Sequence, residues 1–585
     1  MASPFTHFRL GTLPLLTVLA WSSAPGAEPE SMPGTVRHFS ADWDLFSRHW
    51  SAAESSVEQM DAQKRLLESW LITLAAQKPD KLDVNDAIDA VLLKTTLDSG
   101  LNDLARQNEE RAELAQWLPF RTAIEELTVT RLNGTPLKPE IAASKLATLP
   151  AQVYKLQDGI KAAIAKSKEP KKPGLSPAPS AYQAMRCAEI GKMQGDLLKR
   201  WFENQASFVP DFSWWVRQPF EETQKVLESY QKFLNEEIAG IKGDGDRPLI
   251  GKSIGAEELK RQLGYEFIPY SPEDLIGIAE REFAWCETQM KAAAQEMKLG
   301  DDWKAALKKV KEMHVEPGGQ EALVREEAEK AITFVKDRKL VTVPPECEAW
   351  WGTRMLSAAE QKQMPYAAYS GHDIIIAFAT TDMKQEDKTM AMRGNSRPFM
   401  HNVVPHELIP GHHLQRFMAD RHRDYRGLFS TPFYVEGWSL YWEMRLWDLG
   451  YHKTPAEKIG ALFWRMHRCA RIIVTLKFHL GQMKPDEMVK FLTDRVGHEK
   501  FGATSEVQRF IKGDYSPLYQ CGYMLGGLQL MALHKEAVTT GKMTELQFHD
   551  KILTLGPIPI ELARAAVLGL PAPTESSWKF AEPAP

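Results

Sequence analysis

The chain has 585 residues, which is long enough for more than one hydrophobic core. Its formal net charge of −5 argues against a nucleic-acid-binding surface, for which a basic stripe would be expected. Charged residues make up 25% and hydrophobic residues 43%, which are ordinary values for a globular protein.

Residues 1–27 have the features of a secretory signal peptide. Arg9 precedes an apolar run over 10–21, and small residues follow over 22–27. The run is short for a membrane span, although a retained membrane anchor is the alternative. The five cysteines are scattered and offer no disulfide framework; one bridge is allowed, but most are expected to be buried thiols. The signal peptide alone therefore predicts an exported protein, periplasmic or extracellular, with no stable membrane span after cleavage.

Residues 28–180 are dominated by helical patterns. Apolar residues recur at helical spacing over 42–76, 83–118 and 146–165. Asp83 and Asn85 are candidate N-caps of the second run. A stretch rich in Pro, Lys and Ser over 168–180 is typical of an exposed connection. We therefore expect 28–180 to form an N-terminal helical region, followed by a second domain over 181–585.

The second region is also mainly helical, with few strand candidates. Helical spacing resumes over 182–202 and 221–241, and Ser271-Pro-Glu-Asp is a typical start for a long helix. The strand candidates are 339–345 and 374–381, which are both β-branched and bounded by turn residues. The predicted fold is mainly α, a large helical bundle-like body with a small β-sheet beside the functional site.

The stretch Val404–Gln415 reads VPHELIPGHHLQ and brings histidines, a glutamate and a helix breaker together. Imidazole suits a metal such as zinc, and an adjacent carboxylate can take a proton from a metal-activated water. In H-E-x-x-H zinc peptidases the two histidines lie at i and i+4, but here Pro410 holds that position. In an unbroken helix His412 would point roughly 240° away from His406, and His413 would lie about 10 Å along the axis.

Pro410 and Gly411 together can resolve this mismatch. Proline lacks an N–H and clashes with the preceding turn, and glycine tolerates unusual dihedral angles. The pair could eject two residues as a bulge and reset the phase of the helix. His412 would then take the place of the second histidine, and His413 remains the alternative ligand.

A catalytic zinc takes three protein ligands and leaves one position for water. Glu436, in the segment FYVEGWSLYWE, lies thirty residues after His406 and is the candidate third ligand. Gly437 leaves room beside it for another backbone, and Glu443 could hold a ligand histidine by hydrogen bonding. The predicted zinc ligands are His406, His412 and Glu436. Glu407 is the predicted general base.

The segment HELIPGHHLQ at 406–415, followed by EGWSLYWE at 436–443, resembles two motifs of a bacterial family called "domain of unknown function 885". These motifs are H-E-x-x-P-G-H-H and E-G-W-A-L-Y-x-E. Members of that family look like zincin metallopeptidases of the gluzincin type, related in design to helical oligopeptidases and carboxypeptidases. The resemblance runs from about Ser253 to Leu570, and it implies a zincin-like metallopeptidase domain within 181–585.

A later segment, Arg509–Gly522, resembles the family's R-Y…P-G-Q-A-L-S-Y-x-x-G segment, but it lacks the P-G-Q core and aligns only with a one-residue deletion. By this resemblance Tyr519 would donate to the oxyanion of a tetrahedral intermediate, with Tyr515 and Tyr523 as alternatives. A buried core tyrosine is the other interpretation. Arg509 would bind a peptide carboxylate through two parallel hydrogen bonds, or form a salt bridge within its own helix.

These features predict an exported zinc-dependent peptidase with Zn²⁺ as its cofactor. A water activated by the metal and deprotonated by Glu407 would attack the carbonyl of a peptide or an unfolded segment. Two alternatives stay open. One is a metal-dependent hydrolase of another amide or ester, and the other is a non-catalytic peptide-binding protein on the same scaffold.

Overall fold

The computed structural model describes residues 31–581, apart from 78–81, 135–136, 168–177, 244–247, 362–363, 365, 382 and 514. Most of these residues are helical and one small sheet is present, which confirms the predicted fold class. The predicted signal peptide lies outside the described residues. Within the described part, none of the helices has the length and apolar character that a membrane crossing needs.

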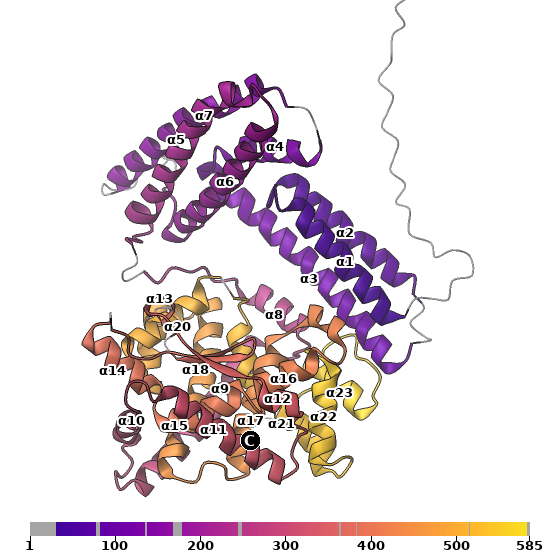
Figure 1. Cartoon of the computed structure of the whole chain (residues 1–585), viewed down its shortest axis with the longest axis vertical. Helices are drawn as coiled ribbons and strands as arrows, with labels where there is room; N and C mark the ends of the chain where they lie inside the picture. The colour runs from indigo at the N-terminus through magenta and orange to yellow at the C-terminus, as the bar shows by residue number, and fades with distance from the viewer. Residues whose placement is uncertain are drawn as a thin grey trace, which may run out of the picture.

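Three helices open the chain and lie against the C-terminal part of the protein (Figure 1). They are α1 (Met32–Trp50), α2 (Val57–Ala75) and α3 (Val84–Leu114). The helical spacing predicted over 42–76 belongs to two helices, because the chain turns after Trp50 and Ser56 caps the second one. Asp83 caps α3, as predicted, by accepting two backbone N–H groups of the first turn. The apolar side chains of these helices join the large C-terminal core.

The next four helices form a separate core. They are α4 (Arg121–Leu132), α5 (Pro139–Ser167), α6 (Ala181–Phe208) and α7 (Phe212–Phe233). In Figure 1 these four helices form a group above the C-terminal part of the molecule. The predicted domain boundary at residue 180 falls between α5 and α6. Because both of these helices pack against α7, that boundary runs through the second core.

The large C-terminal part holds the remaining α-helices. They are α8 (Ala256–Tyr265), α9 (Pro272–Glu296), α10 (Trp303–Lys311), α11 (Gln320–Asp337), α12 (Pro345–Ala349), α13 (Ala358–Gln361), α14 (Gln385–Gly394), α15 (Arg397–Glu407), α16 (His412–Ala419), α17 (Pro432–Asp448), α18 (Pro455–His479), α19 (Pro485–Phe491), α20 (Lys500–Ile511), α21 (Tyr519–His534), α22 (Glu545–Leu555) and α23 (Ile560–Leu568). Ser271 and Asp274 form a reciprocal N-cap on α9, as predicted. All five cysteines are buried free thiols, also as expected.

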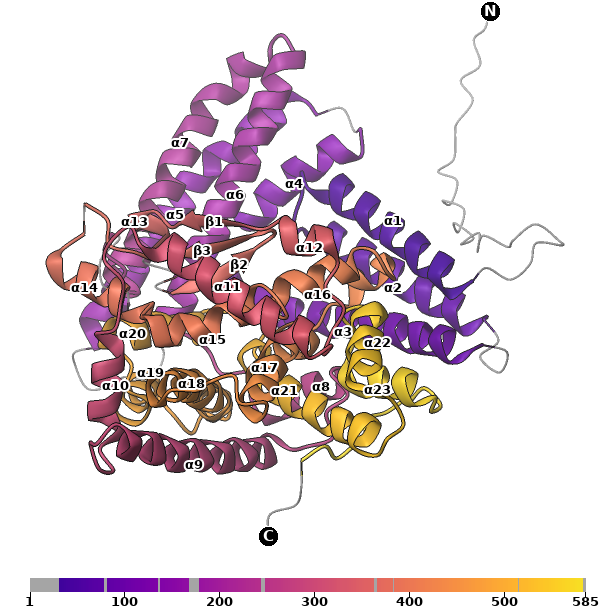
Figure 2. The same ribbon diagram turned by 60° about the horizontal axis from the view of Figure 1, so that its bottom comes forward.

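Helices α17 and α21 cross closely and lie side by side in Figure 2. A Cβ atom on Gly437 would lie 2.6 Å from the Cα of Gly526, and one on Gly526 would lie 1.9 Å from the carbonyl oxygen of Phe433. Only glycine fits at both positions. This confirms the expectation that Gly437 admits a second backbone. The crossing brings Glu436 close to Tyr519, the first residue of α21.

The sheet has three short strands, β1 (Gly352–Met355), β2 (Ala367–Ser370) and β3 (Asp373–Ile376). Their order is β1-β3-β2, with β1 parallel and β2 antiparallel to β3. The strand predicted over 374–381 is present only in its first residues, as β3. The strand predicted over 339–345 is wrong, because the segment is irregular and leads into α12. Pro344 and Pro345 have no N–H for a strand ladder, and Pro345 instead opens the helix.

Candidate metal centre

The helix break predicted between His406 and His412 is present. Helix α15 ends at Glu407, and α16 begins at His412. The chain folds back between them, since the Gly411 N–H donates to the Pro405 carbonyl at 2.9 Å. A Cβ atom on Gly411 would lie 1.8 Å from the His406 carbonyl oxygen, so only glycine fits there. The break therefore separates two helices and is not a bulge within one continuous helix.

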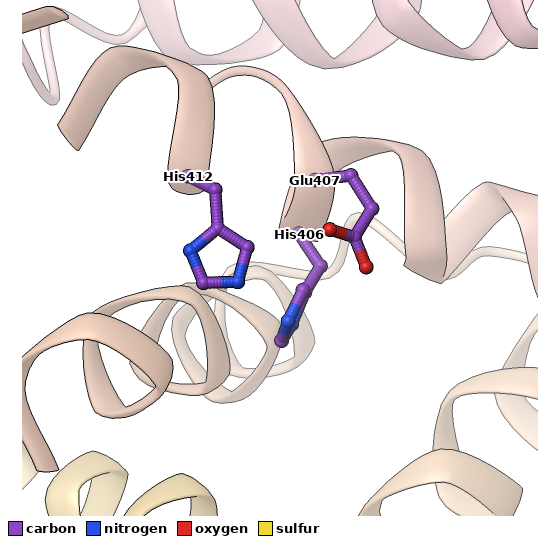
Figure 3. A group of neighbouring side chains, drawn as sticks. All are labelled: His406, Glu407 and His412. Atoms are coloured by element: carbon purple, nitrogen blue, oxygen red, sulfur yellow. The ribbon is translucent and has the colours of Figure 1, made fainter. Parts of the chain in front are cut away.

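The break brings two predicted metal ligands, His406 and His412, together with the predicted general base Glu407 (Figure 3). His406, Glu407 and His412 each offer a ligand atom within 4.8 Å of the others. From α17, Glu436 Oε2 lies 3.2 Å from His412 Nε2 and 3.9 Å from His406 Nε2. Two ligands of a tetrahedral zinc ion at the usual bond lengths are about 3.3 Å apart. Two imidazoles and a carboxylate at these separations therefore fit a zinc ion.

His406 is oriented by a hydrogen-bonded chain behind it. Its Nδ1 lies 2.6 Å from Glu443 Oε1, and Asn402 donates to the other oxygen of Glu443 at 2.8 Å. This contact leaves Nε2 of His406 facing Glu436. Carboxylates that hold the distal nitrogen of a ligand histidine fix its tautomer and raise its basicity. The role expected for Glu443 therefore matches its position.

The electrostatics of this cluster favour positive charge. Burial would lower the pKa of His406, but the carboxylates of Glu436 and Glu443 outweigh burial and raise it to about 9. Burial would raise the pKa of Glu436, but His412 and His406 hold it well below its usual range. The buried site thus stabilises an ionised carboxylate beside a cation. A divalent metal ion supplies such a cation.

His413 faces away from the cluster. Its Nε2 lies 2.9 Å from the Cys347 carbonyl oxygen, and its Nδ1 lies 3.2 Å from the Tyr369 hydroxyl. Both ring nitrogens therefore have partners other than the predicted ligands. Of the two histidines left open by the sequence, His412 is the one next to Glu436.

Glu407 is held by the sheet. One of its carboxylate oxygens accepts the backbone N–H of Tyr369, on edge strand β2, at 2.9 Å. Burial raises the pKa of Glu407, and the nearby histidines oppose this only in part. A buried carboxylate with a raised pKa, fixed beside a candidate metal site, has the properties of a general base.

The two residues predicted from the later segment have different surroundings. Tyr519 donates its hydroxyl to Glu436 Oε1 at 2.6 Å, so it contacts a predicted ligand. Arg509 is paired with Glu506 at 3.0 Å on its own helix and makes no contact with the predicted ligands among the residues described. Tyr523 also lies near the cluster, with its ring nearly parallel to that of His406 at 6.4 Å between centroids.

The sequence matches the family described as "bacterial protein of unknown function (DUF885)" over residues 48–567. The chain belongs to this family. The resemblance seen in the two motifs is thereby confirmed, and the match begins well before Ser253, where the resemblance was expected to start. No curated protein matches the sequence of this family member.

Two solved structures share the fold. One is described as a "putative lipoprotein of unknown function from Shewanella oneidensis"; it is 17% identical, covers 92% of this chain and 100% of its own, and has a TM-score of 0.66. The other is a "putative lipoprotein from Colwellia psychrerythraea", 15% identical, covering 92% and 98%, with a TM-score of 0.58. At such identities the likeness concerns the fold alone.

A cavity of about 520 Å³ lies between the N-terminal helices and the chain that leads into Tyr519. Its walls come from α3, α6 and α8 on one side and from residues 510–513 and 515–518 on the other. Glu266 lines it and accepts the hydroxyl of Thr431, the N-cap of α17. The cavity therefore adjoins the helix that carries Glu436.

Three residues at or near the site carry little or no signal in the sequence. Tyr369 holds Glu407 through its backbone, Asn402 holds Glu443, and the Arg468 guanidinium packs on the Tyr523 ring. A backbone N–H contact can be made by almost any residue, so Tyr369 leaves no pattern. Asn402 lies one turn before His406, and that spacing is the one hint that it faces the same way.

Proposed function

We propose that this protein is an exported zinc-dependent peptidase. The observation that carries the proposal is the convergence of His406, His412 and Glu436 at separations that suit one tetrahedral ion. Glu407 lies beside these three groups and has its own contact with Tyr369, so the ion does not require it as a ligand. Three ligands with a free carboxylate beside them are the arrangement of a hydrolytic zinc site.

Zinc, when bound, would supply a Lewis acid that polarises the substrate carbonyl and acidifies water. Glu407 takes the proton of the attacking water and passes it to the leaving amine. The Tyr369 N–H keeps the Glu407 carboxylate in place during both transfers. Glu443 holds the His406 ring, and the Tyr519 hydroxyl holds the second oxygen of Glu436.

A peptide is the substrate class that the surroundings favour. Strand β2 is at the edge of its sheet, and the Tyr369 N–H on it points to Glu407 and not to β3. An extended peptide that pairs with this edge would pass beside the general base. The adjoining cavity of about 520 Å³ has room for several side chains of a peptide.

The export part of the proposal rests on the apolar N-terminal run. It is in keeping with the two proteins of similar fold, which are described as putative lipoproteins. Detection of the processed chain outside the cytoplasm of the producing cell tests it. Retention of the unprocessed chain in the cytoplasm would refute it.

Metal analysis followed by digestion of a peptide library tests the catalytic part. We expect about one zinc per chain, and peptide cleavage that a chelator abolishes and added zinc restores. If the protein hydrolysed other amides or esters but left peptides uncleaved, it would be a different metal-dependent hydrolase. Peptide binding without turnover would identify a binding protein. Each of these two results would refute the peptidase proposal.

A further inference from the structure

Arg468, on α18, is a buried cation without an anionic partner. It is 8% exposed, and it has neither a hydrogen bond nor an ion pair with any described residue. Its Nε is enclosed without a partner, and its two Nη atoms keep what exposure the guanidinium has. Neighbouring arginines on α18 are paired, Arg465 with Glu282 at 2.8 Å and Arg471 with Glu506 at 2.7 Å. Arg468 is the exception on this helix.

The guanidinium of Arg468 lies next to the candidate metal centre. It packs over the Tyr523 ring at 4.5 Å, and that ring lies 6.4 Å from the His406 ring. The guanidinium is therefore no more than about 11 Å from the ring of a predicted zinc ligand. Helices α15 and α18, which carry His406 and Arg468, pack against each other. The Arg468 charge also acts to lower the pKa values of Glu407 and Glu443, although no hydrogen bond or ion pair joins it to either carboxylate.

The span between this guanidinium and the metal ligands sets the size of what fits. The span is at most about 11 Å, and a guanidinium–carboxylate contact and a metal–ligand contact take up part of it. Because this span is an upper limit, the remainder holds no more than one or two extended residues of about 3.5 Å each. A carboxylate bound by Arg468 would therefore belong to the first or second residue after the cleaved bond.

Burial of an unpaired charge is unfavourable. Such a charge is retained where a bound ligand supplies the opposite charge. The planar guanidinium matches a carboxylate in a two-point contact. We propose that Arg468 binds the free α-carboxylate of the peptide substrate, so that the enzyme removes one or two residues from the C-terminus. This inference rests on the proposed peptidase function and adds the substrate class to it.

Two peptides of the same sequence, one with a free C-terminal carboxylate and one with a C-terminal amide, test the inference. We expect kcat/KM to favour the free acid by on the order of 10- to 100-fold, the range for a hydrogen bond to a charged group. Arg468→Gln should lose this preference by slowing cleavage of the acid alone, and Arg468→Lys should keep part of it. Arg465→Gln, which breaks a paired arginine on the same helix, should leave the preference unchanged.

Binding and stability give readouts that do not depend on turnover. In a Glu407→Gln background the free acid should bind about tenfold or more tightly than the amide, and Arg468→Gln should abolish that difference. Removal of an unpaired buried charge should leave the melting temperature of Arg468→Gln unchanged or raise it. A structural arginine would instead lower the melting temperature when replaced.

The possible failures are distinguishable. Equal cleavage of acid and amide, or fragments cut from the middle of long peptides, would overturn the role of Arg468 and leave the peptidase proposal intact. Equal slowing of both peptides by Arg468→Gln would also overturn it, because the arginine would then act only through its field on Glu407. The absence of zinc and of any peptide cleavage in the wild type would refute the peptidase proposal itself.

Discussion

Replacement of Glu407 by glutamine separates proton transfer from metal binding. Glutamine has the same length, and its Oε1 can accept the Tyr369 N–H that Glu407 accepts at 2.9 Å. The side chain should therefore keep its position and lose only its ability to take a proton. General bases contribute roughly 10²- to 10⁴-fold, so we expect kcat to fall by that factor, or about 3–5 kcal/mol in activation free energy.

Zinc content and stability should survive this change. The three predicted ligands are untouched, and a neutral amide replaces a buried carboxylate whose pKa burial raises. The free energy of unfolding should thus stay the same or rise slightly. Metal analysis, urea unfolding and steady-state hydrolysis measure the three quantities on one preparation.

A matched control is Glu561→Gln on α23. Glu561 is also a buried carboxylate that accepts backbone N–H groups, from Ser577 and Trp578, and it makes no contact with the metal cluster among the residues described. Its substitution should leave kcat unchanged. If Glu407→Gln kept kcat within tenfold of the wild type, Glu407 would not be the general base. If it lost zinc, Glu407 would be a ligand.

Three further predictions concern the metal ligands and the helix break. His412→Ala should abolish stoichiometric zinc binding, whereas His413→Ala should retain it, because His413 bonds Cys347 and Tyr369 instead; zinc titration of both variants decides this, and the reverse outcome would exchange the two assignments. Because the pKa of His406 is about 9 without metal, a proton competes with zinc for this histidine below pH 9. Zinc affinity, measured by chelator competition, should therefore rise about tenfold per pH unit from 7 to 9 and then level off. An affinity that does not change with pH would contradict this prediction. Gly411→Ala should lose zinc and unfold more easily, because its Cβ would lie 1.8 Å from the His406 carbonyl oxygen. Gly264→Ala, whose new methyl group has open space around it, should keep its zinc and its stability. Calorimetry with metal analysis compares the two variants, and equal stability would disprove the steric argument.

Features that depend on a few neighbouring residues were predictable. The N-caps Asp83 and Ser271 follow from side chains that reach back to the first turn of their own helix. The helix break at Pro410–Gly411 follows from proline sterics and from the absence of a Cβ on glycine. The strand expected over 339–345 is absent despite its β-branched residues, because two consecutive prolines lack the N–H groups that a strand ladder needs.

The sequence by itself determined the kinds of side chain at the site and that the helix breaks between His406 and His412. Only the tertiary structure decided that His412 and not His413 lies next to Glu436, that Glu443 holds His406, and that Arg468 has no partner. Spacing along one helix fixes angles and rises for about two turns, and it says nothing of how a second helix approaches. At this site α15, α16 and α17 meet at distances set by burial and by hydrogen bonds that Ser439 and Trp438 of α17 donate to the carbonyls of His406 and Pro410. Those distances decide which nitrogen faces which oxygen, and so where a metal ion fits.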